Sequence, residues 1–298
     1  MCADTAFTKR QLFDSDSPSS PFSEEEEDET FTAASGETGY IRPLYKFKKG
    51  LCLIFNHEDF DIIQADGNKL NSRFGTEIDK NAIVSFFQEI GFIVPEPFQD
   101  MKVDEIKQTL LKYARNEDKL DYDLLACFIL THGNRDQLCA KDNRYPSIML
   151  YEPFLPQNCE LLKDKPKLFF LNACQGEGYD GGFKFDACDV PIDTPEDDDF
   201  FVSMSSVPGF KSWRSSATGS FYIESLIRTL RKSRIENPHE DINSIITTVQ
   251  REIASKVEIS SKQIRNMTEE ERKKYPIIKQ MPIFFSTLRD DLALNAEH

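Results

Sequence analysis

The sequence predicts an α/β protein: a three-layer α/β/α sandwich in which helices cover both faces of a mostly parallel central sheet. Apolar runs of strand length alternate with amphipathic helical patterns along the chain, and this order places successive strands side by side in a parallel sheet. Several of these runs are apolar on both faces, as expected of strands that are covered on both sides. The chain shows no internal repeat, which favours one continuous sheet over separate domains.

The individual elements follow from the spacing of apolar residues. Short apolar runs such as LCLIFN and DLLACFIL indicate buried strands. Apolar residues three and four positions apart indicate helices that pack on one side, and the first of these stops at Gly91. In chain order, we expect strands at residues 51–56, 91–94, 123–130, 168–171, 200–205 and 282–286, and helices over 77–90, 103–115, 220–231 and 241–256.

The negative charge is concentrated in two segments. The net charge is -15, and residues 1–40 hold 10 acidic and 2 basic side chains, whereas residues 183–199 hold 7 acidic and 1 basic. The rest of the chain is therefore nearly neutral. We interpret residues 1–44 as a disordered acidic segment and residues 183–199, which are rich in aspartate and proline, as an exposed linker. Without a basic stripe to neutralise phosphates, nucleic acid is not expected as a partner.

Neither a membrane nor a metal is expected as a partner. The longest apolar run, residues 124–130, is too short to span a bilayer, and the N-terminus lacks the apolar core of a signal peptide. These features predict a cytoplasmic protein. Seven cysteines lie at scattered positions with no C-x-x-C pair, which argues against a disulfide framework and against a zinc site. No cofactor is expected.

One cysteine stands where a nucleophile would be useful. Cys174 follows the buried strand at 168–171 and precedes a glycine-rich loop. In open α/β sheets, ligands bind at the edge where parallel strands end. A lone cysteine after an apolar run is most often a small buried hydrophobe, so the interpretation as a nucleophile requires a base nearby. His132, forty-two residues earlier, follows the strand at 123–130 and should emerge at the same edge.

Two neighbours complete the candidate site. Gly133 lets a substrate backbone approach closely, and its amide together with that of Cys174 could form an oxyanion hole. His57 also follows a strand and is the reserve candidate for the base. The other two histidines, His239 and His298, have the surroundings of surface residues.

The sequence resembles the caspase family over about residues 45–293. The motif NACQG around Cys174 is similar to the family signature QAC[RQG]G, which has a histidine upstream. Further similar motifs are THG at residues 131–133, SRFGTEID with Arg73, the aspartate-rich segment and SWR in PGFKSWRSS. The short N-terminal segment resembles that of effector caspases, and stretches such as IFNHEDFD look most like insect members. The resemblance implies a large, catalytic subunit region at 45–182, a cleavable linker at 183–199 and a small subunit region at 200–298.

The resemblance also implies roles for individual residues. Caspases cleave after aspartate, and a buried carboxylate is well matched by the planar forks of donors on Arg73 and Arg214. In the mechanism implied, Cys174 attacks the carbonyl carbon, His132 protonates the leaving amine, and water hydrolyses the thioester. The other substrate-binding positions implied are Asn172 in the pocket, Ser212 and Trp213 along the substrate backbone, Lys211 at the penultimate side chain and Phe221 in an outer pocket.

The chain departs from the family in this pocket. Asn172 is one methylene shorter than the usual glutamine, and a lost hydrogen bond to a charged group is worth about 1.5 to 3 kcal/mol. Lys211 stands where the family usually has tyrosine, and Asn134 and Arg135 follow His132-Gly133 where acidic residues are common. These departures leave two hypotheses: an aspartate-specific endopeptidase that acts in apoptosis, or a catalytically weak homologue that binds and regulates other caspases.

The linker and the last strand suggest processing and assembly. If the protein is a zymogen, Asp193 is the first choice for cleavage, with Asp186 and Asp189 as alternatives. Asp14 and Asp16, each followed by serine, could mark removal of the N-terminal segment, although both acidic segments could simply be solvated. In the family the last strand, here residues 281–286, pairs across a two-fold axis, so a homodimer or a heterodimer with another caspase is implied. Protein substrates with exposed aspartate, an upstream caspase and apoptosis-inhibitor proteins are the other partners that the resemblance suggests.

Overall fold

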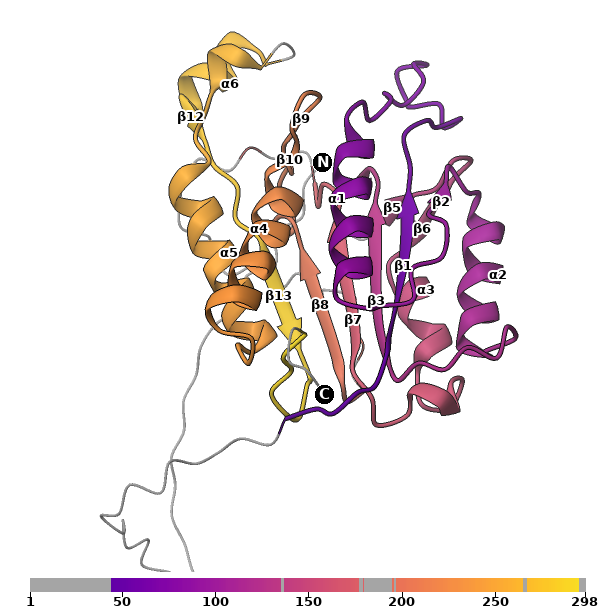
Figure 1. The fold of residues 1–298 in the computed structure, drawn as a ribbon. Coiled ribbons are helices and arrows are strands. Elements are labelled where there is room, and N and C mark those ends of the chain that lie inside the picture. The colour runs from indigo at the N-terminus through magenta and orange to yellow at the C-terminus, as the bar shows by residue number, and fades with distance from the viewer. Residues whose placement is uncertain are drawn as a thin grey trace, which may run out of the picture. The chain divides into compact units, whose positions relative to one another are not determined.

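The structure is a computed structural model of the 298-residue chain (Figure 1). It describes residues 44–134, 137–176, 179, 195, 197–264 and 267–294. The predicted processing sites Asp14, Asp16, Asp186, Asp189 and Asp193 lie outside the described residues, as does most of the predicted linker.

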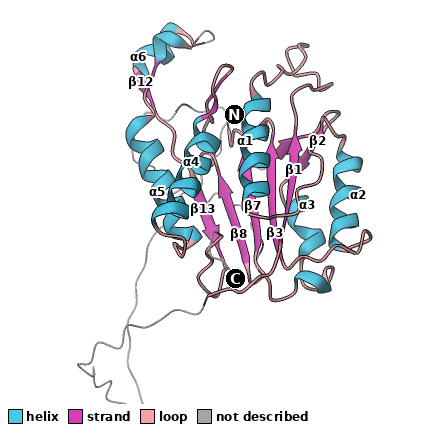
Figure 2. Ribbon diagram, viewed as in Figure 1, coloured by secondary structure: helices cyan, strands magenta, loops and turns pink. Residues whose placement is uncertain are grey.

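A six-stranded sheet forms the centre of the fold (Figure 1, Figure 2). Across the sheet the strands are, in order, β13 (Ile283–Ser286), β8 (Phe200–Met204), β7 (Lys167–Asn172), β3 (Leu124–Leu130), β1 (Gly50–Asn56) and β2 (Phe98–Gln99). Every pair is parallel except β13 with β8, which is antiparallel. The mostly parallel central sheet that the sequence predicts is therefore confirmed.

The central strands are buried on both faces. Every residue of β1, β3, β7 and β8 is buried, which explains their continuous apolar runs. The register places Cys127 opposite Leu53 and Phe169, and all three belong to the same apolar cluster. The neighbouring position, Ala126, pairs with Leu168 and belongs to the cluster on the other face. Alternate side chains thus supply two separate cores.

Helices cover each of these cores, which completes the three layers. The helices α1 (Thr76–Glu89), α4 (Phe221–Glu236) and α5 (Ile242–Lys256) bury their apolar sides in one cluster. The helices α2 (Val103–Ala114) and α3 (Ile148–Tyr151) bury theirs in the other. The four long helices follow the sequence prediction, but α4 continues five residues beyond the expected end.

Residues 91–94 do not form the predicted strand. Ile93 makes only an isolated parallel bridge to Leu51, and the strand at this edge of the sheet is β2, further along the chain. Pro95 and Pro97 follow at once. Because proline has no backbone N–H to donate to a neighbouring strand, the pairing cannot continue through this segment.

Several short elements were not predicted. Besides β2 and α3, they are the three-stranded sheet of β4 (Gly133–Asn134), β5 (Gln137–Cys139) and β6 (Arg144–Pro146), the hairpin of β9 (Arg214–Ser215) and β10 (Gly219–Ser220), the pair β11 (Ile259–Ser260) and β12 (Ile277–Ile278), the helix α6 (Glu269–Lys274), and the 3-10 helices Glu152–Phe154, Glu160–Leu162 and Ser261–Gln263. In Figure 1, β9, β10, β12 and α6 lie beyond the upper ends of the parallel strands, the edge to which their arrows point. These segments are too short to show a helical or strand-like period of apolar residues in the sequence.

The last residue of the predicted linker is part of the folded structure. Asp199 is buried, and it accepts hydrogen bonds from Arg289 Nε at 2.9 Å, from Arg289 Nη2 at 2.6 Å and from the Tyr45 hydroxyl. Burial alone would raise the pKa of Asp199, but these hydrogen bonds hold it below its ordinary value. The carboxylate therefore anchors the start of β8 to the segment that follows β13.

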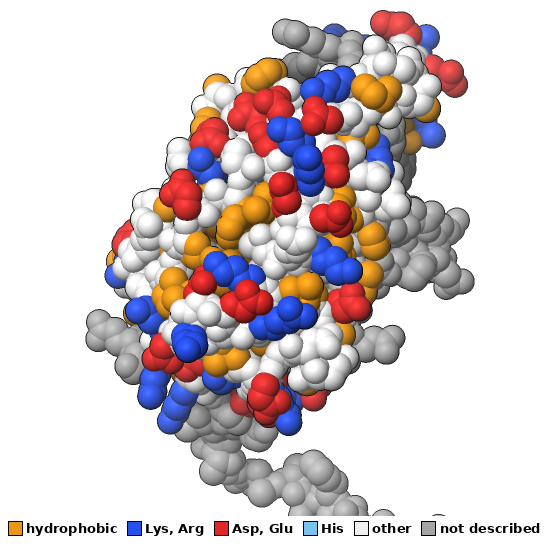
Figure 3. All heavy atoms as spheres, turned by 90° about the vertical axis from the view of Figure 1, so that its right-hand side faces the viewer, with side chains coloured by type: hydrophobic (Ala, Val, Ile, Leu, Met, Phe, Trp, Pro, Cys, Tyr) orange, Lys and Arg blue, Asp and Glu red, His pale blue; other side chains and the backbone are white. Residues whose placement is uncertain are grey.

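Two surface properties bear on the expected partners. Figure 3 shows basic and acidic side chains intermingled on the displayed face, so this face presents no continuous basic surface. Among the helices of the described ranges, none has the length and apolar character needed to cross a bilayer.

Candidate active site

Cys174 and His132 meet at the carboxyl edge of the sheet. The strands β3 and β7 are neighbours, and their last residues, Leu130 and Asn172, pair directly. Each functional residue lies two positions beyond its strand, so the topology brings them together as expected. They share a cavity of 180 Å³ that is lined by Arg73, Thr131, His132, Asn172, Ala173, Cys174, Ser212, Trp213 and Arg214.

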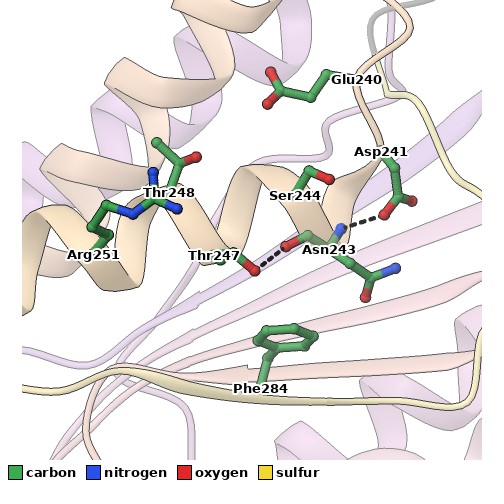
Figure 4. A pocket seen from close by; sticks show the side chains of 8 residues that line it. All are labelled: Glu240, Asp241, Asn243, Ser244, Thr247, Thr248, Arg251 and Phe284. Carbon is green, nitrogen blue, oxygen red and sulfur yellow. Dashed lines mark hydrogen bonds between the residues drawn. The ribbon is translucent and has the colours of Figure 1, made fainter.

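Another cavity is larger but lacks reactive groups. It measures 530 Å³ and lies between α5 and Phe284 of β13 (Figure 4). Its lining consists of Glu240, Asp241, Asn243, Ser244, Thr247, Thr248, Arg251 and Phe284, and includes no cysteine or histidine. The Asp241 carboxylate accepts the Asn243 N–H in it and thereby caps the helix. Chemistry, and not size, therefore identifies the smaller cavity as the candidate active site.

The His132 ring is oriented by a backbone group. Its Nε2 lies 2.8 Å from the carbonyl oxygen of Asn71, and its ring packs against Phe60 with 5.0 Å between centroids. Because a carbonyl can only accept, Nε2 carries the hydrogen and Nδ1 keeps a free lone pair. Burial and the positive charges of Arg73, Arg214 and Arg144 lower the pKa of His132 to about 4, against the opposing effect of the Asn71 carbonyl. The imidazole is thus neutral near pH 7.

The thiol of Cys174 contacts the segment that lines the opposite wall. Sγ accepts the Ser212 N–H at 3.4 Å and lies 3.7 Å from the Ser212 carbonyl oxygen. Between the described residues, no hydrogen bond joins this thiol to His132. The backbone at Cys174 can lie close to the backbone at residue 133 because that residue is glycine: a Cβ atom on Gly133 would lie 2.7 Å from the Cys174 carbonyl oxygen. Any larger residue at this position would displace the segment that carries Cys174.

The two arginines form a cationic pocket. Arg73 is only 2% exposed, and its Nη1 donates to the His57 carbonyl at 3.0 Å and to Thr76 Oγ1 at 2.8 Å. Arg214 donates through Nε to the carbonyl oxygen of Phe74 at 3.1 Å. Burial and repulsion by Arg214 lower the pKa of Arg73 to about 9. Neither guanidinium pairs with a carboxylate of the described residues, so an anionic ligand would compensate both charges.

His57, the reserve candidate for the base, has a structural role. Its ring is buried away from the cavity, with Nε2 3.1 Å from the Met101 carbonyl oxygen. Its own carbonyl oxygen supports Arg73. The structure therefore connects His57 to the pocket through its backbone and does not bring its imidazole to Cys174.

Asn172 is held by groups that sequence reasoning did not identify. Its Nδ2 donates to Ser220 Oγ at 3.0 Å and to Asp79 Oδ2 at 3.3 Å, and Asp79 also accepts the Ser220 N–H at 2.8 Å. Burial raises the pKa of Asp79 even though Ser220 and the two pocket arginines favour its charged form. One signal could have found Asp79: an acid four residues before Ile83, on the apolar side of the predicted helix.

The remaining predicted residues divide between the cavity and its surroundings. Ser212 and Trp213 line the cavity. Lys211 does not, because its Nζ lies 4.0 Å above the ring of Tyr179. Phe221 begins α4 and lines a different hollow between α4 and α5, where its ring packs against the core. The structure thus does not bring Lys211 and Phe221 to the cavity that holds Cys174.

Comparisons with known proteins agree with this geometry. The family model described as Caspase domain matches residues 49–293. Caspase-1 of Spodoptera frugiperda is 34% identical over 78% of this chain and 76% of its own length. Caspase-1 of Drosophila melanogaster is 36% identical over 69% of this chain and 63% of its own length. The crystal structure of the Spodoptera protein superposes with a TM-score of 0.70 over 86% of this chain and 94% of that one, at 32% identity. The chain therefore belongs to the caspase family and is a caspase-type cysteine peptidase.

Proposed function

We propose that this peptidase acts in apoptosis by cleaving protein substrates after aspartate. The observation that carries the proposal is the pair of largely desolvated guanidinium groups, Arg73 and Arg214, in the same cavity as Cys174. A short carboxylate is the side chain that two such groups select, and a basic side chain would be repelled. The similarity to caspases supports the same assignment.

In the proposed reaction, Cys174 Sγ attacks the carbonyl carbon that follows the bound aspartate side chain. The thiol proton passes to Nδ1 of His132, which can accept it because the hydrogen of the neutral ring lies on Nε2, bonded to the Asn71 carbonyl. The amides of Gly133 and Cys174 would stabilise the oxyanion. His132 then protonates the leaving amine, and a water molecule, deprotonated by the same ring, hydrolyses the thioester and regenerates the thiol.

Binding of aspartate would also prepare the base. Arg73 and Arg214 are among the groups that lower the pKa of His132. A substrate carboxylate between them compensates their charge, so the pKa of His132 rises toward its ordinary value when the correct side chain is bound. A neutral side chain leaves the repulsion in place, which makes the proton transfer itself selective for aspartate.

We further propose processing and dimerisation. Cleavage in the segment 183–199, at Asp193 before Asp186 or Asp189, would convert a zymogen, and Asp14 or Asp16 would release the N-terminal segment. For a dimer, the support is that β13 is the edge strand of the central sheet and that Phe285 of this strand is 37% exposed. A second β13, from an identical chain or another caspase, would continue the sheet and cover this ring. A cytoplasmic location, activation by an upstream caspase and control by apoptosis-inhibitor proteins complete the proposal.

Hydrolysis of fluorogenic peptides tests the proposed activity. Purified protein should cleave peptides with Asp at the cleaved position and not those with Asn or Arg. Cys174→Ala should abolish the turnover, whereas Cys159→Ala, at a buried cysteine outside the cavity, should retain it. Equal cleavage of Asp and Asn peptides would contradict the role of the arginines. No turnover after the linker is cut near Asp193 would favour the alternative, a weak homologue that binds and regulates other caspases.

A further inference from the structure

A single buried amide joins three segments around the active site. Gln280 lies between β12 and β13 and is only 1% exposed. Its Oε1 accepts the backbone N–H of Trp213 at 3.0 Å, and its Nε2 donates to the Ser205 carbonyl oxygen at 2.7 Å and to Ser212 Oγ at 3.4 Å. Both ends of the amide are therefore bonded to residues far away in the sequence.

One set of these bonds leads to the segment before the nucleophile. Ser205 directly follows β8, its N–H donates to the Leu171 carbonyl at 3.0 Å, and its hydroxyl donates to the Ala173 carbonyl at 3.1 Å. Ala173 precedes Cys174 in the chain. Holding the Ser205 carbonyl therefore fixes the backbone from which the thiol projects.

The other set leads to the wall that faces the thiol. Gln280 holds the Trp213 amide and the Ser212 hydroxyl, and the Ser212 N–H is itself in contact with Cys174 Sγ at 3.4 Å. Both residues line the cavity. The Gln280 amide thus sets the distance between the nucleophile and the wall along which a bound peptide would lie.

We propose that Gln280 is a positioning residue, whose side-chain amide holds the segments before Cys174 and around Trp213 in the arrangement that accepts a peptide. This inference rests on the proposed function. Gln280 also lies three residues before the edge strand β13, and between them the Pro282 carbonyl oxygen accepts a hydrogen bond from Gln250 Nε2 of α5 at 3.0 Å. The position of β13 is thereby connected to the active site through one side chain.

Replacement by glutamate provides a graded test. In Gln280→Glu the carboxylate keeps the shape and still accepts the Trp213 N–H, but it cannot donate to the Ser205 carbonyl. Burial and the facing carbonyl oxygen would raise the pKa of this glutamate. As the pH falls and the carboxyl group gains a proton, the donor returns. Gln280→Met lacks both functions at every pH.

The kinetic prediction is a pH-dependent loss of activity. With Asp peptides at pH 7.5, both variants should lose about 100-fold in kcat/KM, since a displacement of about 1 Å near the reacting groups costs that much. The ratio of the wild-type kcat/KM to that of Gln280→Glu should decrease several-fold by pH 5.5, whereas the corresponding ratio for Gln280→Met should not change. Gln108→Glu, on the exposed side of α2, adds the same charge and should behave as wild type.

Fluorescence provides a readout that does not depend on activity. Trp213 is the only tryptophan of the chain, so emission reports the environment of the residue that Gln280 holds. Both variants should shift the emission maximum of Trp213 at pH 7.5, and Gln280→Glu should return toward wild type at pH 5.5. Unchanged emission in both variants, or kcat/KM within threefold of wild type, would overturn the inference. A wild-type protein that cleaves no peptide would overturn the proposed function instead, and the emission of Trp213 would still decide whether Gln280 holds the wall.

Discussion

Replacing Arg73 by methionine should strongly reduce cleavage after aspartate while leaving the fold about as stable as before. The guanidinium is buried, and no carboxylate of the described residues pairs with it. Methionine retains much of the length and apolar volume of the side chain. The substitution therefore separates two effects of the charge: its contribution to the binding of an aspartate substrate, and its effect on the free energy of unfolding of the free protein.

Two terms of similar size set the effect on stability. Burial and the Arg214 charge lower the pKa of Arg73 to about 9, which corresponds to about 5 kcal/mol against the charged form at 1.36 kcal/mol per pKa unit. Against this stand two hydrogen bonds from the cation, to the His57 carbonyl and Thr76 Oγ1, worth about 1.5 to 3 kcal/mol each. The free energy of unfolding should thus change by less than about 2 kcal/mol.

The effect on catalysis is not cancelled in this way. Removing one partner of a buried charge pair costs about 2 to 5 kcal/mol, so kcat/KM for an Asp peptide should fall about 30- to 5000-fold. Peptide hydrolysis and urea denaturation measure the two quantities, with Arg115→Met, at a side chain that is 64% exposed, as the control. A loss in kcat/KM below tenfold, or destabilisation by more than about 4 kcal/mol, would refute the reasoning.

Three further predictions concern protonation, folding and assembly. His132 should remain neutral down to about pH 5, because its pKa is lowered to about 4; an NMR titration of the ring with a midpoint near 6.5 would contradict this. Asp199→Asn should lower the free energy of unfolding by about 2 to 4 kcal/mol at pH 7. Because the pKa of Asp199 is depressed in the folded state, this difference should be lost as the pH falls through that pKa, and urea denaturation between pH 3 and 7 that shows a constant difference would argue against it. Phe285→Arg should give a monomer in analytical ultracentrifugation, whereas Ile235→Arg, at an 83% exposed position on α4, should remain a dimer. Two variants that sediment alike would count against β13 as the interface.

The candidate nucleophile and base could be predicted from the sequence because their positions depend on local patterns. Cys174 and His132 each follow a long apolar run, and parallel strands end at a common edge. Residues 91–94, in contrast, do not form the predicted strand, because prolines end this apolar run after a single bridge from Ile93 to Leu51. The sequence also did not indicate that Lys211 lies on the ring of Tyr179, because nothing in the spacing connects the two.

What the sequence determined by itself is therefore the layered fold, whereas it predicted Cys174 and His132 as nucleophile and base and, through the resemblance to caspases, two arginines suited to a carboxylate. The tertiary structure alone decided which groups orient the side chains and backbone around the cavity. These groups are the Asn71 carbonyl for His132, Asp79 for Asn172 and Gln280 for the wall around Trp213. The physical reason is that apolar periodicity is a property of neighbouring residues, whereas the partners of buried polar atoms are chosen by segments that meet only after the chain has folded. One of these partners, the Asn71 carbonyl, is a backbone group, which every residue carries and which no side-chain pattern can reveal.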